Sequence, residues 1–326
     1  MRKGLEKLRK CNVCKSNKIK FAFKCKEDLI GKNETFSMFK CSNCNLYFLN
    51  PRPNSSTIMK YYPDDYFAYG IDYNAASLKS RLGLFLYKKL FTDKINIPKL
   101  VLFPLKKFMM GLIVKKDAKV LDVGTGAGGW LLVINKLGME GYGLDPCKKA
   151  IKLAKKHGLK VKAGTLQSSN YPDNFFDIIT LYNVIEHVHN PLEDLRELKR
   201  ILKPGGTLII YTPNTGSLFF KTTKENWPHL GAPQHLNLFS TKTLDICAKK
   251  IGFQCIQKRY MSEPRMIVLG SYIWFRRKLG LKIKSKKKSR LYNNQFSCFY
   301  LLPLSWIIDS LKLSEAIEVY FRKPLG

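Results

Sequence analysis

The pattern of hydrophobic and polar positions changes character at Lys119. From there, short runs of β-branched and other apolar residues alternate with stretches in which apolar residues recur every three or four positions. Such alternation is typical of parallel strands joined by crossover helices. The pattern predicts an α/β fold with a mostly parallel, seven-stranded sheet and helices on both faces. The strands are expected at 119–123, 141–144, 160–163, 176–181, 207–211, 253–258 and 316–322.

One helix is marked at both ends, between the fourth and fifth of these strands. Pro191 suits its first position, and Asn190 is expected to cap it through its side chain. A proline and two glycines at 204–206 stop it. Its apolar residues form one stripe that can face the sheet, made of Leu192, Leu195, Leu198 and Ile201. Another helix is predicted to begin at Thr241.

Four segments follow from these patterns. Residues 1–55 are turn-rich and form a small cysteine-bearing module, which closes with Asn50-Pro51-Arg52-Pro53. Residues 56–117 form a helical linker or cover, with amphipathic helices expected near 82–91 and 100–114. Residues 118–214 form the core of the sheet. Residues 215–326 contribute a substrate-side loop, a basic and aromatic segment and the last strands.

The composition indicates the class of protein, the charge of its partners and its cellular compartment. The chain has 326 residues, of which 45% are hydrophobic and 25% charged, as in ordinary folded proteins. Its formal charge of +33 favours anionic partners, although solvated lysine-rich faces would give the same count. The odd number of cysteines, nine, and the C-x2-C pairs fit a reduced compartment better than a disulfide framework. Without a signal-like or membrane-spanning apolar run, we expect a cytoplasmic protein.

A glycine-rich loop follows the first strand of the sheet. The run Val120 to Gly129 reads Val-Leu-Asp-Val-Gly-Thr-Gly-Ala-Gly-Gly, and Asp145 ends the next strand nineteen residues after Gly126. Open α/β sheets bind nucleotides at such a loop, and a carboxylate at the position of Asp145 can take both hydroxyls of a ribose. The arrangement is Rossmann-like, and its spacing alone leaves the identity of the cofactor open.

Further motifs stand in order along the core. They are Gly143-Leu144-Asp145, Tyr171-Pro172-Asp173-Asn174-Phe175-Phe176-Asp177, Asn183-Val184-Ile185-Glu186-His187-Val188 and Arg200-Ile201-Leu202-Lys203-Pro204-Gly205-Gly206. With these motifs the chain resembles the class I methyltransferases that use S-adenosylmethionine (SAM), in the branch that modifies small molecules and glycans. The resemblance covers about 118–214, and the segment from Ala316 resembles the last strand of that family.

The resemblance implies SAM as cofactor and assigns its contacts. Asp122 and the loop glycines would face the amino-acid part of SAM, Asp145 the ribose, and the Thr165–Leu166 segment the adenine. Many relatives have an acidic residue where this chain has Thr165, so backbone contacts are expected to replace its side chain there. The full cofactor set is Asp122, Gly124, Thr125, Gly126, Gly128, Asp145, Thr165, Leu166 and Asn183.

Two cysteine pairs predict a metal site. Cys11 and Cys14 form one C-x2-C pair, and Cys41 and Cys44 form the other. Two such thiolate pairs can close a tetrahedral site around one structural Zn²⁺, as in a zinc-ribbon-like module. A closed site has no free coordination position, so we assign it to structure or substrate docking. Unligated buried cysteines are the alternative.

Histidines provide the candidate bases. His187, with Glu186, falls just after the fourth strand, and His189 follows. His229 and His235 lie in an aromatic insertion, 227–240, that resembles the substrate-side loop of glycan-associated methyltransferases. We predict that His187, His235 and Glu186 are catalytic, although for each histidine a purely structural hydrogen-bonding role remains open.

The segment 276–290 holds nine basic residues and no acidic one, between apolar and aromatic neighbours. It suits the anionic inner face of a membrane, and a solvated loop is the competing interpretation. RNA binding is less favoured, because no RNA-recognition motif accompanies the charge.

The sequence therefore predicts a SAM-dependent methyltransferase for a small-molecule or lipid-linked acceptor, most favourably a glycan or nucleotide-sugar. The sugar C-methyltransferases also combine a cysteine zinc module with this type of domain. A nucleic-acid methyltransferase and a non-catalytic protein that binds SAM and zinc are the two alternatives.

Overall fold

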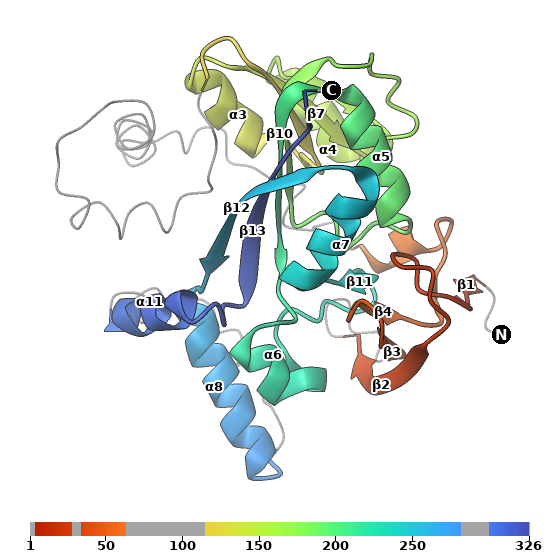
Figure 1. The fold of residues 1–326 in the computed structure, drawn as a ribbon, viewed down its shortest axis with the longest axis vertical. Helices are drawn as coiled ribbons and strands as arrows, with labels where there is room; N and C mark the ends of the chain where they lie inside the picture. Colours follow the sequence, from red (N-terminus) through yellow and green to blue (C-terminus); the bar gives the residue numbers. More distant parts are fainter. Residues whose placement is uncertain (1–3, 28–33, 63–114, 282–299, 326) are drawn as a thin grey trace.

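The computed structural model of the chain describes residues 4–27, 34–62, 115–281 and 300–325. Figure 1 shows a sheet that runs through the middle of the molecule, with the N-terminal segment packed against one end. The amphipathic helices expected near 82–91 and 100–114 lie outside the described residues. So does most of the basic segment, from residue 282 onward.

The seven-stranded sheet is confirmed. Its order is β12-β13-β10-β9-β6-β7-β8; β13 pairs antiparallel with both of its neighbours, and the pairs from β10 to β8 are parallel. The chain leaves β6 in one direction along the sheet and later returns to its other side with β9. Such a reversal opens a crevice at the carboxyl ends of the two strands. The strands are β6 (Lys119–Val123), β7 (Glu140–Asp145), β8 (Lys160–Ala163), β9 (Phe176–Tyr182), β10 (Leu202–Pro213), β12 (Gln254–Met261) and β13 (Ala316–Arg322).

Helices cover both faces of the sheet, as predicted. α3 (Gly129–Lys136) and α4 (Lys148–Lys156) pack against one face, in a core that includes Val120. α5 (Pro191–Ile201) and α7 (Thr241–Ile251) pack against the other, in a core that includes the next residue, Leu121. Successive side chains of a strand point to opposite faces, so two adjacent apolar residues in β6 serve both cores.

α5 has the predicted limits and buries the predicted leucine stripe. The expected side-chain cap by Asn190 is wrong: its side chain makes no capping hydrogen bond. Its main-chain carbonyl instead accepts hydrogen bonds from the amides of Glu193 and Asp194, at 3.0 and 3.2 Å. The polar side chain at this position is therefore not what starts the helix.

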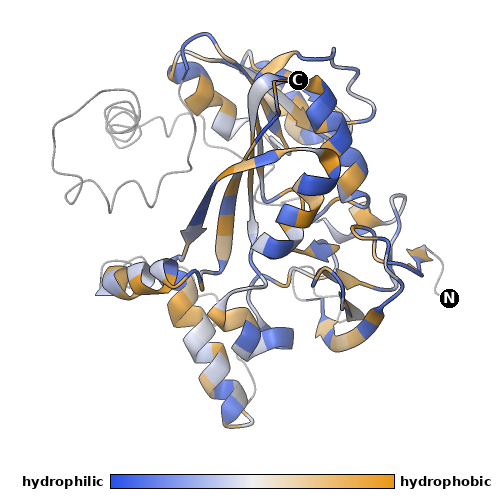
Figure 2. Ribbon diagram, in the orientation of Figure 1, coloured by the Kyte–Doolittle hydropathy of each residue, from blue (hydrophilic) through white to orange (hydrophobic). Residues whose placement is uncertain are grey.

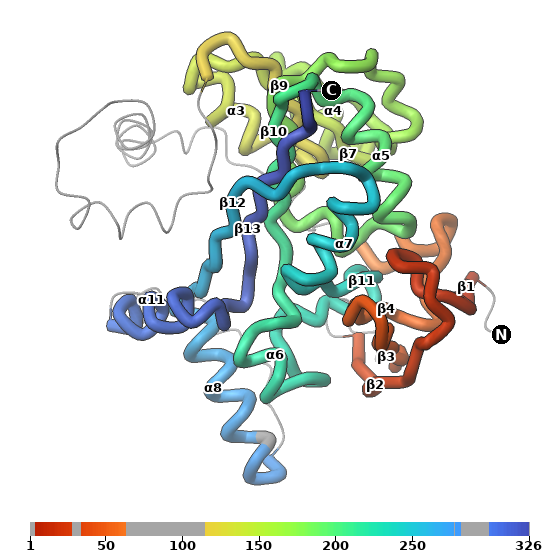
Figure 3. Tube along the Cα trace, viewed as in Figure 1, coloured from red at the N-terminus to blue at the C-terminus, as the bar shows by residue number. Residues whose placement is uncertain are grey.

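The N-terminal segment forms a second, smaller sheet. Its order is β11-β4-β3-β2, with β2 (Ile19–Lys26), β3 (Thr35–Cys41), β4 (Tyr47–Leu49) and, from far along the chain, β11 (Asn237–Leu238). In Figure 3 the red and orange N-terminal segment lies beside β11 and α7. The N-terminal segment also contains β1 (Leu5–Glu6) and β5 (Arg52–Pro53), which pair in a separate two-stranded sheet, and the short helix η1 (Ile58–Tyr61). The insertion after β10 thus supplies an edge strand to the cysteine module.

The remaining elements lie at the end of the molecule away from α3 (Figure 1). They are α6 (Leu218–Thr223), η4 (Lys224–Asn226), α8 (Pro264–Lys278) and α11 (Leu302–Ser310). Across the residues that the structure describes, every helix is too short or too polar to cross a bilayer.

Candidate functional site

The glycine loop between β6 and α3 is held in left-handed backbone conformations. Gly124, Gly126 and Gly128 have φ angles of 72°, 54° and 88°. A side chain at Gly124 would also collide with Val184, because a Cβ there would lie 2.4 Å from the Val184 Cγ2 atom. Glycine is the residue that tolerates both demands. The loop after β9 therefore packs directly on the glycine loop.

Asp145 ends β7 and is buried beside that loop. The Gly126 amide donates to its Oδ2 atom at 2.9 Å, and the Cys147 amide donates to Oδ1 at 2.8 Å. A carboxylate oxygen has two lone pairs, so each oxygen of Asp145 retains one acceptor position for a hydroxyl group. Burial raises the pKa of Asp145, and the two amides oppose that effect. The geometry fits the predicted binding of two ribose hydroxyls.

Asp122 lies in β6, two residues before the first glycine of the loop. It is almost fully buried, and the Thr180 hydroxyl donates to its Oδ1 atom at 2.8 Å. Burial raises its pKa to about 7, against hydrogen bonds from Thr180 and Thr125. A buried carboxyl group with this pKa would be ionised by a nearby ammonium group, such as that of an amino acid.

The remaining predicted cofactor residues flank this loop. Leu166 is buried, whereas Thr165 is exposed and its amide donates to the Ser168 Oγ atom at 2.9 Å. Asn183 is exposed at the end of β9, with a φ angle of 54°. Because the Thr165 amide is engaged within its own turn, a backbone contact to adenine would fall to another residue of that turn. These assignments stay predictions.

Glu186, His187 and His235 come together at the carboxyl edge of the sheet. One potential ligand atom from each of the three lies within 4.8 Å of the other two. The two imidazole rings are nearly perpendicular, with centroids 4.7 Å apart. Glu186 is fully buried; Thr212 donates to its Oε2 atom at 2.9 Å, and Oε1 has no partner among the described residues. We refer to these residues as the Glu-His-His trio.

The partners of the two histidine rings favour one tautomer of each. His235 Nδ1 lies 2.9 Å from the His229 carbonyl oxygen, and His187 Nδ1 lies 3.1 Å from that of Gln234. A ring nitrogen that faces a carbonyl oxygen carries the proton, which leaves Nε2 as the acceptor. Burial lowers the pKa of His187 to about 3 and that of His235 to about 4. Both rings are therefore neutral near pH 7.

Glu186 shifts the other way, because burial raises the pKa of its carboxyl group to about 7. The pKa of the carboxyl group is thus shifted up and those of the two imidazoles are shifted down. Groups whose pKa values are shifted apart in this way are typical of sites of acid–base chemistry. Sequence reasoning missed one member of the trio's surroundings, Tyr62, whose hydroxyl lies 2.9 Å from His187 Nδ1. The only sequence signal was its place in a tyrosine-rich stretch just beyond the cysteine module.

The other two clustered histidines do not join the trio. His189 turns toward the cysteine module, where its Nε2 atom lies 3.0 Å from the Pro53 carbonyl oxygen. His229 supplies the carbonyl group that holds His235, and its own ring packs against Trp227. His157 lies at the C-terminal cap of α4, on a helix far along the sheet from β9.

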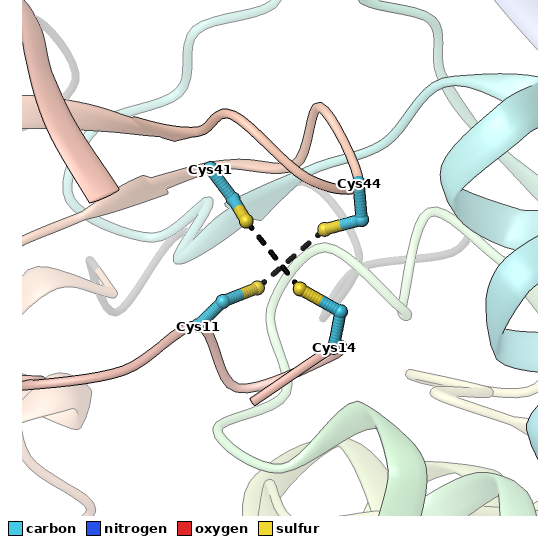
Figure 4. Close-up of side chains that lie close together, drawn as sticks. All are labelled: Cys11, Cys14, Cys41 and Cys44. Atoms are coloured by element: carbon cyan, nitrogen blue, oxygen red, sulfur yellow. Dashed lines mark hydrogen bonds between the residues drawn. The ribbon is translucent and has the colours of Figure 1, made fainter. Parts of the chain in front are cut away.

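The four paired cysteines converge, as Figure 4 shows. Cys11 and Cys44 have Sγ atoms 3.5 Å apart, those of Cys14 and Cys41 are 3.4 Å apart, and all four lie within 4.8 Å of one another. Thiolates on one tetrahedral zinc, with bonds of about 2.3 Å, would lie about 3.8 Å apart. The cluster therefore has the size of a zinc site.

Both cysteine pairs have the same local backbone. Lys15 and Asn45, each one residue after a pair, have φ angles of 62°, and their amides donate to the Cys11 and Cys41 carbonyls. The Cys44 thiol hydrogen bond, followed by the amides of Cys14 and Val13, lowers the pKa of Cys11 to about 5 against the effect of burial. Burial raises the pKa of Cys41, and the hydrogen bond to Cys11 raises that of Cys44. Without an ion, one thiolate is therefore shared among protonated thiols, and a metal would replace the remaining protons.

The cysteine module is joined to the trio through Asn12 and Asn237. Asn12, inside the first cysteine pair, donates to the Asn237 Oδ1 atom at 2.8 Å and to the His189 carbonyl at 3.3 Å. Asn237 donates through its main chain to the Glu186 carbonyl at 3.0 Å and through its side chain to the Val188 carbonyl at 2.7 Å. One bridge of two buried asparagines thus connects both loops that carry the trio to the module.

In comparison with known proteins, residues 97–258 of the chain match a family described as "Methyltransferase domain". The phosphoethanolamine N-methyltransferase of Plasmodium falciparum is 30% identical over 130 residues, which cover 37% of this chain and 47% of that protein. A demethylmenaquinone methyltransferase of Listeria monocytogenes is 32% identical over 113 residues, covering 32% and 48%. The chain thus spans about half the length of these relatives.

Among solved structures, the chain is similar to a putative sarcosine dimethylglycine methyltransferase from Galdieria sulphuraria. The TM-score is 0.46 and the identity 17%, with 81% of this chain and 92% of that one covered.

Proposed function

We propose that this protein transfers a methyl group from SAM to a small-molecule or lipid-linked acceptor. The observation that carries the proposal is the packing of two loops on each other. The glycine loop beside Asp145 meets the loop after β9 at Val184, and that second loop presents Glu186 and His187. A cofactor site and an acid–base trio therefore share one edge of the sheet, which is where open α/β sheets bind ligands.

Methyl transfer makes modest demands on the protein. The methyl carbon leaves the sulfonium of SAM as a bond forms to the acceptor, so the site has to align the two, exclude water and accept a proton where the acceptor loses one. We assign the alignment of SAM to the glycine loop and Asp145. Either His187 or His235 accepts the acceptor's proton through Nε2, and the ionised Glu186 carboxylate stabilises the imidazolium that results.

For the acceptor, we favour a glycan or nucleotide-sugar. The insertion at 227–240 supports this, because it resembles the substrate-side loop of glycan-associated methyltransferases. The two named relatives take phosphoethanolamine and demethylmenaquinone, which are also small molecules. The most direct test incubates the protein with isotope-labelled SAM and nucleotide-sugars, extracted lipid-linked glycans or RNA. Label in RNA alone would contradict the assignment.

We also propose that the four-cysteine cluster holds Zn²⁺. Four sulfurs from two identical turns leave no position for a water or substrate ligand, so the ion would hold the module together and would not act on the acceptor. Elemental analysis of protein purified without chelator is expected to give one zinc per chain.

We expect the Asp145 carboxylate to contribute to SAM affinity. Asp145→Ala removes both acceptors for the ribose hydroxyls and leaves the Gly126 and Cys147 amides unpaired. We expect SAM to bind more weakly by about 1.5–3 kcal/mol, as measured by calorimetry. Asp173→Ala, an exposed aspartate before β9, is the matched control. Equal SAM affinity of the Asp145 variant and the control would refute the ribose role. Tight SAM binding by wild-type protein that methylates no acceptor would favour a non-catalytic binding protein.

A further inference from the structure

α11 carries an apolar stripe on its outer side. Ser305 and Ile308 face the body of the protein and are buried. Leu304, Ile307 and Leu311 lie three and four residues apart on the other side, and Ile307 and Leu311 are 56% and 62% exposed. Tyr300, one turn earlier, is 85% exposed. A helix on the surface of a soluble domain normally has the opposite arrangement, with its apolar stripe turned inward.

The distal end of α8 has the same character. Met266, Leu269 and Ile273 of α8 are buried, whereas Trp274, Phe275, Leu279 and Leu281, toward and beyond its end, are exposed. In Figures 1 and 2, α8 and α11 extend from the rest of the molecule and carry orange, hydrophobic residues. Most of the large apolar side chains that the described residues expose lie on this surface, which we call the α8–α11 surface: Trp274, Phe275, Leu279, Leu281, Tyr300, Leu304, Ile307 and Leu311.

The charge of the surrounding sequence identifies the kind of partner. Between Pro264 and Ile308 the chain has no Asp or Glu, but it has ten basic residues: Arg265, Arg276, Arg277, Lys278, Lys282, Lys284, Lys286, Lys287, Lys288 and Arg290. Lys278 lies over the Trp274 ring at 5.2 Å, a pairing of an aromatic ring and a cation that suits the headgroup region of a bilayer. A second copy of the chain is a poor partner, because a symmetric contact would bring like charges together.

We propose that the α8–α11 surface docks on an anionic lipid bilayer, with its apolar side chains among the acyl chains and with the positive charge of the surrounding sequence attracting it to the headgroups. The surface has both components that stable peripheral binding requires, which are apolar area and positive charge. Docking does not depend on the proposed methyl transfer, since none of these residues belongs to the cofactor loop or the Glu-His-His trio. It would bring the protein to a surface where lipid-linked acceptors reside.

Vesicle flotation of the full-length chain tests the proposal. The probes are phosphatidylcholine vesicles and vesicles of phosphatidylcholine with phosphatidylglycerol. We expect binding to the anionic vesicles only, weakening as salt is raised. Ile307→Ser with Leu311→Ser should reduce the affinity at least about tenfold by removing inserted apolar groups. Replacing Lys286, Lys287 and Lys288 with glutamine should reduce it by about 100-fold.

Matched variants separate this surface from general effects of charge and hydrophobicity. Ile256→Ser changes an exposed isoleucine on β12, and glutamine at Lys152, Lys155 and Lys156 on α4 lowers the net charge by the same three units. Both controls should float like the wild-type protein. If they lose binding as the test variants do, the proposal is wrong.

Two further results would overturn it. In the first, the wild-type protein does not bind anionic vesicles but forms a dimer in ultracentrifugation. The Ile307→Ser variant is then a monomer, which would make the surface a dimer interface. The other is binding to RNA without binding to vesicles. Neither flotation nor ultracentrifugation requires SAM or turnover, so failure here and failure of the proposed methyltransferase activity can be told apart.

Discussion

Replacing His187 or His235 with alanine is expected to lower kcat on the true acceptor by about 10²–10⁴ and to leave SAM affinity near that of the wild-type protein. Both rings are held by a carbonyl group at Nδ1, are neutral near pH 7 and lie against each other beside Glu186. The two rings contact each other, the Tyr62 hydroxyl and the carbonyl groups of Gln234 and His229, which all lie outside the glycine loop. Calorimetry with SAM and single-turnover rates separate binding from chemistry.

The pH dependence of kcat should be governed by Glu186. The sequence alone predicts that loss of a histidine removes a limb near the ordinary imidazole pKa of about 6.5. Burial changes that expectation, because it lowers the pKa of His187 to about 3 and raises that of Glu186 to about 7. Glu186 is neutral below its pKa and ionised above it, so kcat should rise with pH to about 7. Glu186→Gln should abolish that rise.

Two controls make this prediction specific. His157→Ala, on α4, removes a histidine outside the trio and should leave kcat and its pH profile unchanged. Burial also raises the pKa of Asp122 to about 7, but Asp122 belongs to the proposed SAM site, so saturating SAM separates its titration from that of Glu186. Near-normal rates and profiles in both single histidine variants would show that alignment alone explains catalysis, and these histidines would be structural.

The central sheet could be predicted because its signals are local. A change of hydrophobic period marks each strand and helix, and the glycines at 124, 126 and 128 fix the loop after β6. The grouping of the Glu-His-His trio could also be predicted from the sequence. Glu186 and His187 directly follow a recognisable strand, and the carboxyl ends of neighbouring parallel strands meet at one edge of a sheet.

Contacts between distant segments could not be predicted. Asn12 and Asn237 are 225 residues apart, and their hydrogen bond depends on β11 joining β4 in the cysteine module. A two-residue strand has too short a pattern to be recognised in a sequence. α8 and α11 were missed as helices for another reason. Their apolar residues occur on both the buried and the exposed sides, which obscures the helical period.

Removing the metal from the cysteine module is expected to abolish turnover while SAM still binds. Without an ion the four sulfurs lose the bonds that would hold the two turns together, and metal-dependent modules of this size commonly unfold when the ion is withdrawn. Cys11, Cys41 and Cys44 are buried in the same hydrophobic cluster as residues of α7, so the disturbance would reach the main domain. The measurements are zinc content, SAM affinity and turnover after chelation, each repeated after zinc is restored.

Hydrogen exchange should show where the disturbance goes. We expect faster exchange in 11–49, 183–189 and 234–238 after chelation, and unchanged exchange in β6 and β7, which carry the SAM loop. Cys44→Ser should reproduce the effect, and Cys255→Ser, at an exposed cysteine on β12, should not. Chelated protein that contains no zinc yet keeps its exchange pattern and turnover would contradict a structural metal site.

The asparagine bridge explains why turnover would suffer more than SAM binding. Asn12 holds Asn237 and the His189 carbonyl, and Asn237 in turn holds the Glu186 carbonyl, so the module sets the distance between the two loops of the trio. A displacement of about 1 Å at a reacting centre can cost about 10²-fold in rate. Asn12→Ala, which leaves all four cysteines in place, should therefore lower kcat by about tenfold or more with zinc still bound and SAM affinity unchanged. Asn43→Ala, an exposed asparagine in the second cysteine pair, is the matched control. Equal rates in the two variants would mean that the module supports the fold without positioning the trio.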